Sequence, residues 1–222
     1  MRIRRAAAAV AIGAATIALA SCGAPSYDVE AIDLGEPGEV TAAGTTLAFD
    51  EPAWIEADVY RGEPGDDPVT EVVGFTVRDI IEREPSVWEQ FGNSEEFEGD
   101  VPWAIIVQQT FTGEPFEAES WVEGADVDTE SVWPLLENGD SAELLYIEFQ
   151  DDDAIQEACG ISFPSYDAET NTAMRCLLAA APEGQKVVGA LYDSTSAGGL
   201  SVPTLPGQEP ENPYLEQPLV WQ

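Results

Sequence analysis

The stretch Trp103-Ala104-Ile105-Ile106-Val107-Gln108 decides the fold class, because its pattern repeats at every second residue. In an extended chain Trp103, Ile105 and Val107 share one face, and the residues between them share the other. β-Branched and aromatic side chains are also enriched in strands. We therefore predict a β-strand over residues 103–108.

Similar period-two runs recur at residues 55–60, 72–78, 144–149, 174–180 and 187–192. The tripeptide Pro182-Glu183-Gly184 predicts a hairpin turn between the last two runs. Residues 214–221 predict a further strand at a sheet edge, since Pro218 lacks a backbone N–H. One helical turn is expected at residues 85–91. Together these segments predict an all-β protein, an antiparallel β-sandwich with short helical turns.

The first residues predict export. Three arginines within the first five residues precede an apolar run from Ala6 to Ala20, in which Thr16 is the only polar side chain. This run is shorter than a membrane-spanning helix and ends in small residues, as signal peptides do. We therefore interpret residues 1–21 as a signal peptide.

The residues Leu19-Ala20-Ser21-Cys22 resemble the lipobox of bacterial lipoproteins. In that family the cysteine receives a thioether-linked diacylglycerol and becomes the new N-terminus after cleavage. The resemblance implies a lipid anchor on Cys22, and acyl chains anchor firmly because each buried methylene contributes about 0.8 kcal/mol. We expect the protein at the extracytoplasmic face of the membrane, joined to it through this anchor.

Residues 22–46 are rich in Gly, Pro, Ala and acids and show little hydrophobic periodicity. Such a composition buries too little apolar surface to offset the entropy of ordering. We therefore predict a flexible acidic tether over 22–46 and one folded domain over 47–222.

The chain is strongly acidic, with a formal net charge of −35 at pH 7. Removal of the signal peptide leaves 43 acidic residues and only these basic ones: Arg61, Arg78, Arg83, Arg175 and Lys186. Such a surface repels phosphate backbones and anionic lipid headgroups. Nucleic acid is therefore excluded as a partner, and the lipid alone is expected to hold the protein at the membrane.

Two cysteines remain once Cys22 is acylated. Cys159 and Cys176 form an even pair in an oxidising compartment, which predicts a disulfide. A redox pair would favour the close spacing C-x-x-C, which is absent. We interpret the pair as structural.

Four segments together resemble a family of immunoglobulin-like domains of unknown function that is common in lipoproteins of Gram-positive bacteria. They are GFTVRDI (74–80), PWAIIVQQTFTGEPF (102–116), APEGQKVVGALYD (181–193), which a cysteine precedes, and PLVWQ (218–222). The family is itself similar to a secreted mycobacterial immunogenic protein. The resemblance implies an immunoglobulin-like sandwich over 47–222 and an extracytoplasmic role, without catalytic residues.

The absence of histidine removes most catalytic possibilities. Catalytic triads, Cys-His pairs and His-ligated metals all need this residue. A hydrolase based on two carboxylates remains as the lower alternative, but sequence spacing cannot nominate the pair among so many acids. We expect no enzymatic activity.

Calcium is the metal that best suits this composition, because it prefers oxygen ligands. Asp126, Asp128 and Glu130 alternate along a segment that a loop could bring together, and they are the candidate ligands. A plain solvated loop is the competing interpretation. Residues 151–153, three consecutive aspartates, favour the start of a short helix, where acids suit the helix dipole. No other cofactor is expected.

The tryptophans raise the question of saccharide binding, since exposed indole rings stack on sugars. Three have apolar neighbours and are expected in the core: Trp54, Trp103 and Trp133. Three lie beside acids or near residue 222 and are expected at the surface: Trp88, Trp121 and Trp221.

The sequence thus favours a lipid-anchored, non-enzymatic module that binds a protein or saccharide of the cell envelope. A calcium- or saccharide-binding surface module is the alternative.

Overall fold

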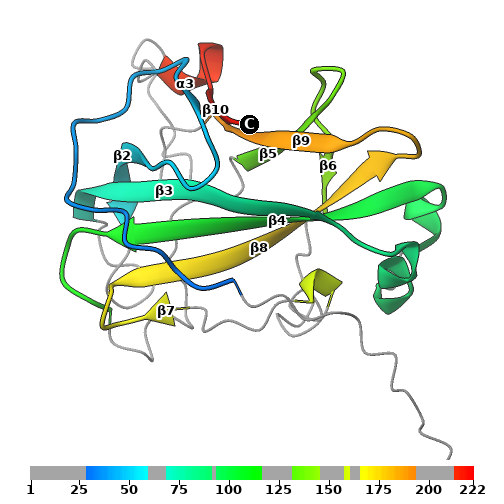
Figure 1. Cartoon of the computed structure of the whole chain (residues 1–222), viewed down its shortest axis with the longest axis horizontal. Coiled ribbons are helices and arrows are strands. Elements are labelled where there is room, and N and C mark those ends of the chain that lie inside the picture. Colours follow the sequence, from blue (N-terminus) through cyan, green and yellow to red (C-terminus); the bar gives the residue numbers. More distant parts are fainter. Residues whose placement is uncertain are drawn as a thin grey trace, which may run out of the picture.

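Two β-sheets pack face to face in the computed structural model (Figure 1). It describes residues 29–59, 69–91, 94–116, 132–145, 158–160, 166–193 and 213–222. The predicted all-β sandwich is confirmed. No helix among these residues has both the length and the apolar character needed to cross a membrane.

The larger sheet has six strands, in the order β2-β3-β4-β8-β6, with β7 also paired to β8. All its pairs are antiparallel. The strands are β2 (Ala53–Val59), β3 (Val69–Glu82), β4 (Asp100–Phe111), β6 (Glu143–Leu144), β7 (Tyr166–Asp167) and β8 (Thr172–Pro182). The strands expected at 55–60, 72–78 and 103–108 correspond to β2, β3 and β4.

The smaller sheet has the order β1-β10-β9-β5. Its strands are β1 (Thr46–Leu47), β5 (Val132–Leu136), β9 (Val187–Tyr192) and β10 (Leu219–Trp221). A short helix, α3 (Pro213–Glu216), precedes β10. β10 runs parallel to β1 and antiparallel to β9. A strand within 214–221 is confirmed, but its expected position at a sheet edge was wrong, because β10 lies between β1 and β9 and Pro218 precedes the paired residues.

The hairpin predicted around Pro182-Glu183-Gly184 was also wrong. The turn exists, since the Gln185 backbone N–H donates to the Pro182 carbonyl at 2.9 Å and Gly184 has a positive φ of 85°. However, β8 belongs to the six-stranded sheet and β9 to the four-stranded one. The turn therefore carries the chain from one sheet to the other instead of pairing two neighbours.

The main core lies between the two sheets. Phe75 of β3 packs against Tyr192 of β9 and Trp221 of β10, with ring centroids 5.7 and 5.6 Å away. Trp221 is fully buried, and its indole N–H donates to the Glu51 carbonyl at 2.9 Å. This partner is what lets a polar indole sit in the core.

The tryptophan predictions had a mixed outcome. Trp54 and Trp103 are buried, as expected. Trp133 was expected in the core but is 37% exposed, because alternate side chains of β5 face the core between the sheets and Trp133 lies on the other face, toward the solvent. Trp88 and Trp221 were expected at the surface and are buried, whereas Trp121 lies outside the described residues.

The outer face of the six-stranded sheet is covered as well. Ala104 and Ile106 of β4 pack there with Met174 and Cys159. Gln108 is buried on the same strand, where its side-chain amide donates to the Ile32 carbonyl at 2.7 Å and its oxygen accepts from the Ile32 N–H at 3.0 Å.

Residues 29–41, which the sequence assigns to the tether, therefore lie against this sheet, whereas Thr45 and Thr46 pair with β10 of the smaller sheet (Figure 1). Leu34 is buried there, and the Thr41 backbone N–H donates to the Trp54 carbonyl at 2.7 Å. Hydrogen bonds to the main chain of this segment and the burial of Leu34 therefore order a stretch whose sequence shows no hydrophobic periodicity.

The predicted disulfide between Cys159 and Cys176 is formed. It ties residues 158–160, on the outer face, to the middle of β8. Arg83 adds a second attachment, because its Nε donates to the Ala158 carbonyl at 3.1 Å. Two independent links therefore hold this short segment against the sheet.

Candidate functional site

Most of the residues proposed from the sequence as site residues lie outside the described part of the chain. These are Cys22, Asp126, Asp128, Glu130 and the aspartates at 151–153. Within the described ranges, no three acidic or cysteine side chains converge as metal ligands would.

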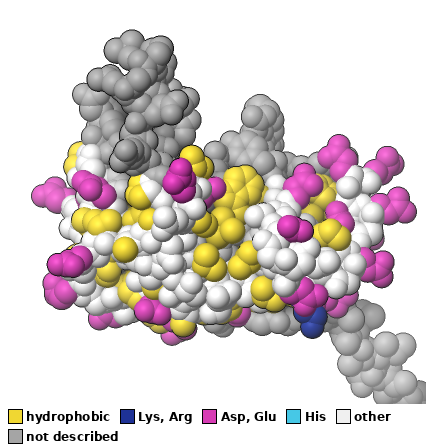
Figure 2. Space-filling view, turned by 90° about the horizontal axis from the view of Figure 1, so that it is seen from above, with side chains coloured by type: hydrophobic (Ala, Val, Ile, Leu, Met, Phe, Trp, Pro, Cys, Tyr) yellow, Lys and Arg dark blue, Asp and Glu magenta, His cyan; other side chains and the backbone are white. Residues whose placement is uncertain are grey.

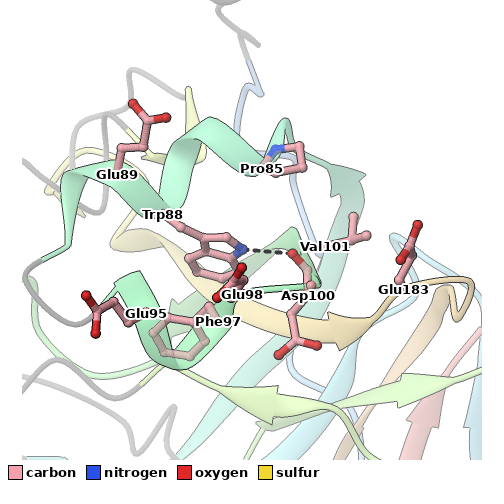
Figure 3. Close-up of a pocket in the computed structure, with 10 residues that line it drawn as sticks. Pro85, Trp88, Glu89, Glu95, Phe97, Glu98, Asp100, Val101 and Glu183 are labelled. Carbon is pink, nitrogen blue, oxygen red and sulfur yellow. Dashed lines mark hydrogen bonds between the residues drawn. The ribbon is translucent and has the colours of Figure 1, made fainter.

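The structure instead presents a groove at one end of the sandwich, where two 3₁₀ helices, the start of β4 and the β8–β9 turn meet (Figure 3). The helices are η1 (Pro85–Gln90) and η2 (Ser94–Phe97). The groove has a volume of about 530 Å³, within the range of roughly 300–1,000 Å³ typical of small-ligand sites. Its lining residues are Pro85, Trp88, Glu89, Glu95, Phe97, Glu98, Gly99, Asp100, Val101 and Glu183.

Two aromatic rings form the apolar wall of this groove. Trp88 and Phe97 stack with centroids 4.7 Å apart and planes at 22°, and each is only 5% exposed. The Trp88 indole N–H donates to the Asp100 carbonyl at 2.9 Å, as Figure 3 shows. Stacking on one side and this hydrogen bond on the other fix the indole without any ligand.

The local sequence explains how η1 places Trp88. Pro85 occupies the first turn, where a missing N–H is harmless, and Glu84 before it is extended, as a residue preceding proline prefers. Phe91 ends the helix by donating its backbone N–H to the Trp88 carbonyl at 3.0 Å. The helical turn expected at residues 85–91 is thus present as a 3₁₀ helix.

The aromatic wall rests on a small hydrophobic cluster of its own. Leu178 and Ala180 of β8 and Ala158 of the disulfide-bound segment pack in the same cluster as Trp88 and Phe97. Ala158 is adjacent to Cys159, so the disulfide holds a segment that contributes to this cluster. The wall is therefore braced by a covalent link rather than by burial alone.

Five carboxylates surround the groove. Four are solvent-exposed and Asp100 is half-buried; the exposed ones are Glu89, Glu95, Glu98 and Glu183. Figure 3 shows them spread around the ring pair rather than aimed at one point. Figure 2 shows acidic side chains at both ends of the described surface, including the end that holds η1 and η2, with apolar side chains between.

Two titratable groups outside the groove have shifted pKa values. The pKa of Asp167 is lowered, chiefly because its carboxylate accepts the backbone N–H of Glu169 and then the hydroxyl of Thr170. Burial raises the pKa of Tyr214, whose hydroxyl donates to the Thr41 carbonyl at 2.8 Å. The groove combines an apolar wall with five carboxylates, four of them solvent-exposed, which is an arrangement suited to binding.

Sequence reasoning missed this groove. Its signal is the segment 85–101, PSVWEQFGNSEEFEGDV, in which acids alternate with aromatic residues. Such a pattern resembles an exposed loop, because only the contact with β8 makes the aromatic residues part of a wall.

The chain has no detected relative. Comparisons with protein-family models, with curated proteins and with solved structures find no match.

Proposed function

We propose that this protein is a lipid-anchored, extracytoplasmic module of the cell envelope that acts without catalysis, by binding a partner in the groove between η1, η2 and the β8–β9 turn. The observation that carries the proposal is the ordered aromatic wall of Trp88 and Phe97 beside an open cavity of about 530 Å³. Because the wall is already fixed, a ligand meets little ordering cost on binding.

Two features support the location. Cys22 lies in a lipobox-like sequence that follows a signal-like segment. The disulfide between Cys159 and Cys176 fits an oxidising compartment, where such bonds persist.

The strand order supports the finer, immunoglobulin-like assignment. Immunoglobulin constant-type domains place strands A-B-E-D in one sheet and C-F-G in the other. Matching β3, β4, β5, β6, β8, β9 and β10 to strands A to G gives β3-β4-β8-β6 and β5-β9-β10, which are neighbours here. The disulfide differs, since it links the E-equivalent strand to a segment outside the sheets, and β1, β2 and β7 are additions.

The anchor is tested by expressing the full chain in a Gram-positive host. We expect the protein in the membrane fraction and a diacylglyceryl group on Cys22 by mass spectrometry, while Cys22→Ser is released into the medium. A mature N-terminus at another residue, without lipid, would refute the anchor.

The groove is tested separately with a neutral apolar fluorophore, Nile red, on the released Cys22→Ser chain. Val101 lines the groove, so Val101→Trp should fill it and abolish the fluorescence gain. Val188 is 41% exposed on β9, outside the groove, so Val188→Trp is the matched control. Equal binding to both variants would show that the groove is not the binding site.

A further inference from the structure

We infer that the groove is selective for a cationic peptide segment, in which lysine or arginine residues flank an aromatic or aliphatic side chain. This inference rests on the proposed binding function and adds the chemical class of the ligand.

The negative charge of the groove rim favours a positively charged ligand. Five carboxylates line the groove, and among the described residues none of them forms an ion pair with a cation of the chain. Arg78 is engaged by Asp50 at 2.6 Å, and Arg83 is directed to the Ala158 carbonyl. A cationic ligand therefore meets complementary charge, while an anionic ligand is repelled.

The spacing of the carboxylates favours a chain over a single ion or small amine. They come from five places along the chain: η1, η2, the turn between η2 and β4, the start of β4 and the β8–β9 turn. Figure 3 shows the carboxylates on different sides of the Trp88 and Phe97 rings. One point charge cannot approach them all, and they do not converge as a cation site within the described residues. Several positive charges spaced along a peptide can.

The apolar wall favours a ligand that also carries an aromatic or aliphatic side chain. Pro85, Val101 and the small exposed parts of Trp88 and Phe97 present apolar surface to the cavity. Burying an apolar side chain there removes apolar surface from water, which favours binding. The volume of about 530 Å³ suits a few side chains of a short segment rather than a folded domain.

The test uses the released Cys22→Ser chain and isothermal titration calorimetry with acetyl-Lys-Lys-Phe-Lys-Lys-amide. Two comparison peptides separate the contributions: one replaces phenylalanine by glycine, and the other replaces every lysine by glutamate. We expect the Lys-Phe peptide to bind more tightly than either, and its affinity to fall with added salt.

Matched variants locate the interaction. Glu98→Gln with Glu183→Gln removes two charges from the rim, and we expect binding to weaken roughly two- to thirtyfold, because two exposed ion pairs together contribute about 0.4–2 kcal/mol. Glu36→Gln with Glu39→Gln removes two exposed charges from the N-terminal segment, which Figure 1 shows away from η1 and η2, and should leave binding nearly unchanged.

The outcomes separate this inference from the proposed function. Equal binding of the glycine peptide, or equal weakening by both charge pairs, would mean generic attraction to an acidic surface and would overturn the inference. Equal binding of the glutamate peptide would overturn it too. If the peptide results overturn the inference but Val101→Trp still abolishes Nile red binding, the groove binds apolar ligands and the proposed function stands. If Val101→Trp leaves Nile red binding unchanged, the proposed function fails as well.

Discussion

Removing the disulfide between Cys159 and Cys176 should destabilise the protein by about 3 kcal/mol. The bond joins residues 17 positions apart, and closing a loop of about this length lowers the entropy of the unfolded chain by an amount worth about 3 kcal/mol at 25 °C. The variant Cys159→Ala with Cys176→Ala keeps small apolar side chains beside Ile106 and Met174, so the cost of a cavity stays low.

The assay is urea unfolding followed by far-ultraviolet circular dichroism, in the Cys22→Ser background so that no other thiol is present. We expect the unfolding free energy to fall by about 3 kcal/mol and the Tm by roughly 6–12 °C, given the size of the chain. The unsubstituted pair treated with a reductant should match the double variant, which is the internal control.

The same variant tests the bracing of the groove. Ala158 packs with Trp88 and Phe97, and without the disulfide it is held by this packing and by the Arg83 hydrogen bond but by no covalent link. Nile red binding should therefore weaken in the folded double variant. A loss of stability below about 1 kcal/mol, together with unchanged stability on reduction, would refute the loop-entropy reasoning. Unchanged dye binding would refute the bracing.

Three further predictions follow from single positions. A Cβ on Gly189 would lie 2.3 Å from the Trp221 carbonyl oxygen, so Gly189→Ala should cost about 1–3 kcal/mol in thermal unfolding, whereas Val188→Ala on the exposed face should cost little. Asn171 has φ 51° and donates its side-chain amide to a main-chain carbonyl of β4; Asn171→Gly keeps that conformation and should cost about 1–2 kcal/mol in urea unfolding, and Asn171→Ala more. The pKa of Asp167 is lower in the folded chain because its carboxylate accepts a backbone N–H two residues later. The stability that this carboxylate contributes is therefore present at neutral pH and lost as the pH falls through the folded pKa, and the unfolding free energy of Asp167→Asn should lack this part of the pH dependence. A carboxyl NMR titration that gives an unshifted pKa for Asp167 would contradict this prediction.

Alternation along the sequence predicted which residues face the core between the sheets. The alternation over residues 72–78 puts Val73, Phe75 and Val77 on one face, and all three are fully buried. The opposite face of β4 was harder, because alternation assumes that the other side meets water. Ile106 and Gln108 are buried there by segments distant in sequence, and Gln108 has its polar groups satisfied by the main chain of Ile32.

The sheet to which a strand belongs was not predictable from its neighbours. Pro182, Glu183 and Gly184 form the kind of turn that their sequence indicates. The same turn can join two paired strands or connect two sheets. Here it connects two sheets, because β8 pairs with β4 and β6 whereas β9 pairs with β10 and β5. Local residues encode the turn, whereas long-range packing decides what it joins.

The groove shares this limitation. Trp88 and Phe97 look like exposed loop residues until β8 supplies the surface that buries them. Glu183 comes to the rim only because the chain changes sheets at its turn. The segment 85–101 carries most of the lining, but its neighbours in space could not be derived from spacing.

The position of β10 between β1 and β9 has a consequence for the order of folding. β2 pairs with β3 and β3 pairs with β4, its successor along the chain, so these three strands can assemble early. β1 must wait for β10, and the hydrogen bond from Trp221 to Glu51 spans 170 positions. Contacts of such separation slow folding. A chain that crosses a membrane N-terminus first would therefore keep β1 unpaired until β10 has also emerged, and a folding factor on the far side would have its longest opportunity to act on that half-built sheet.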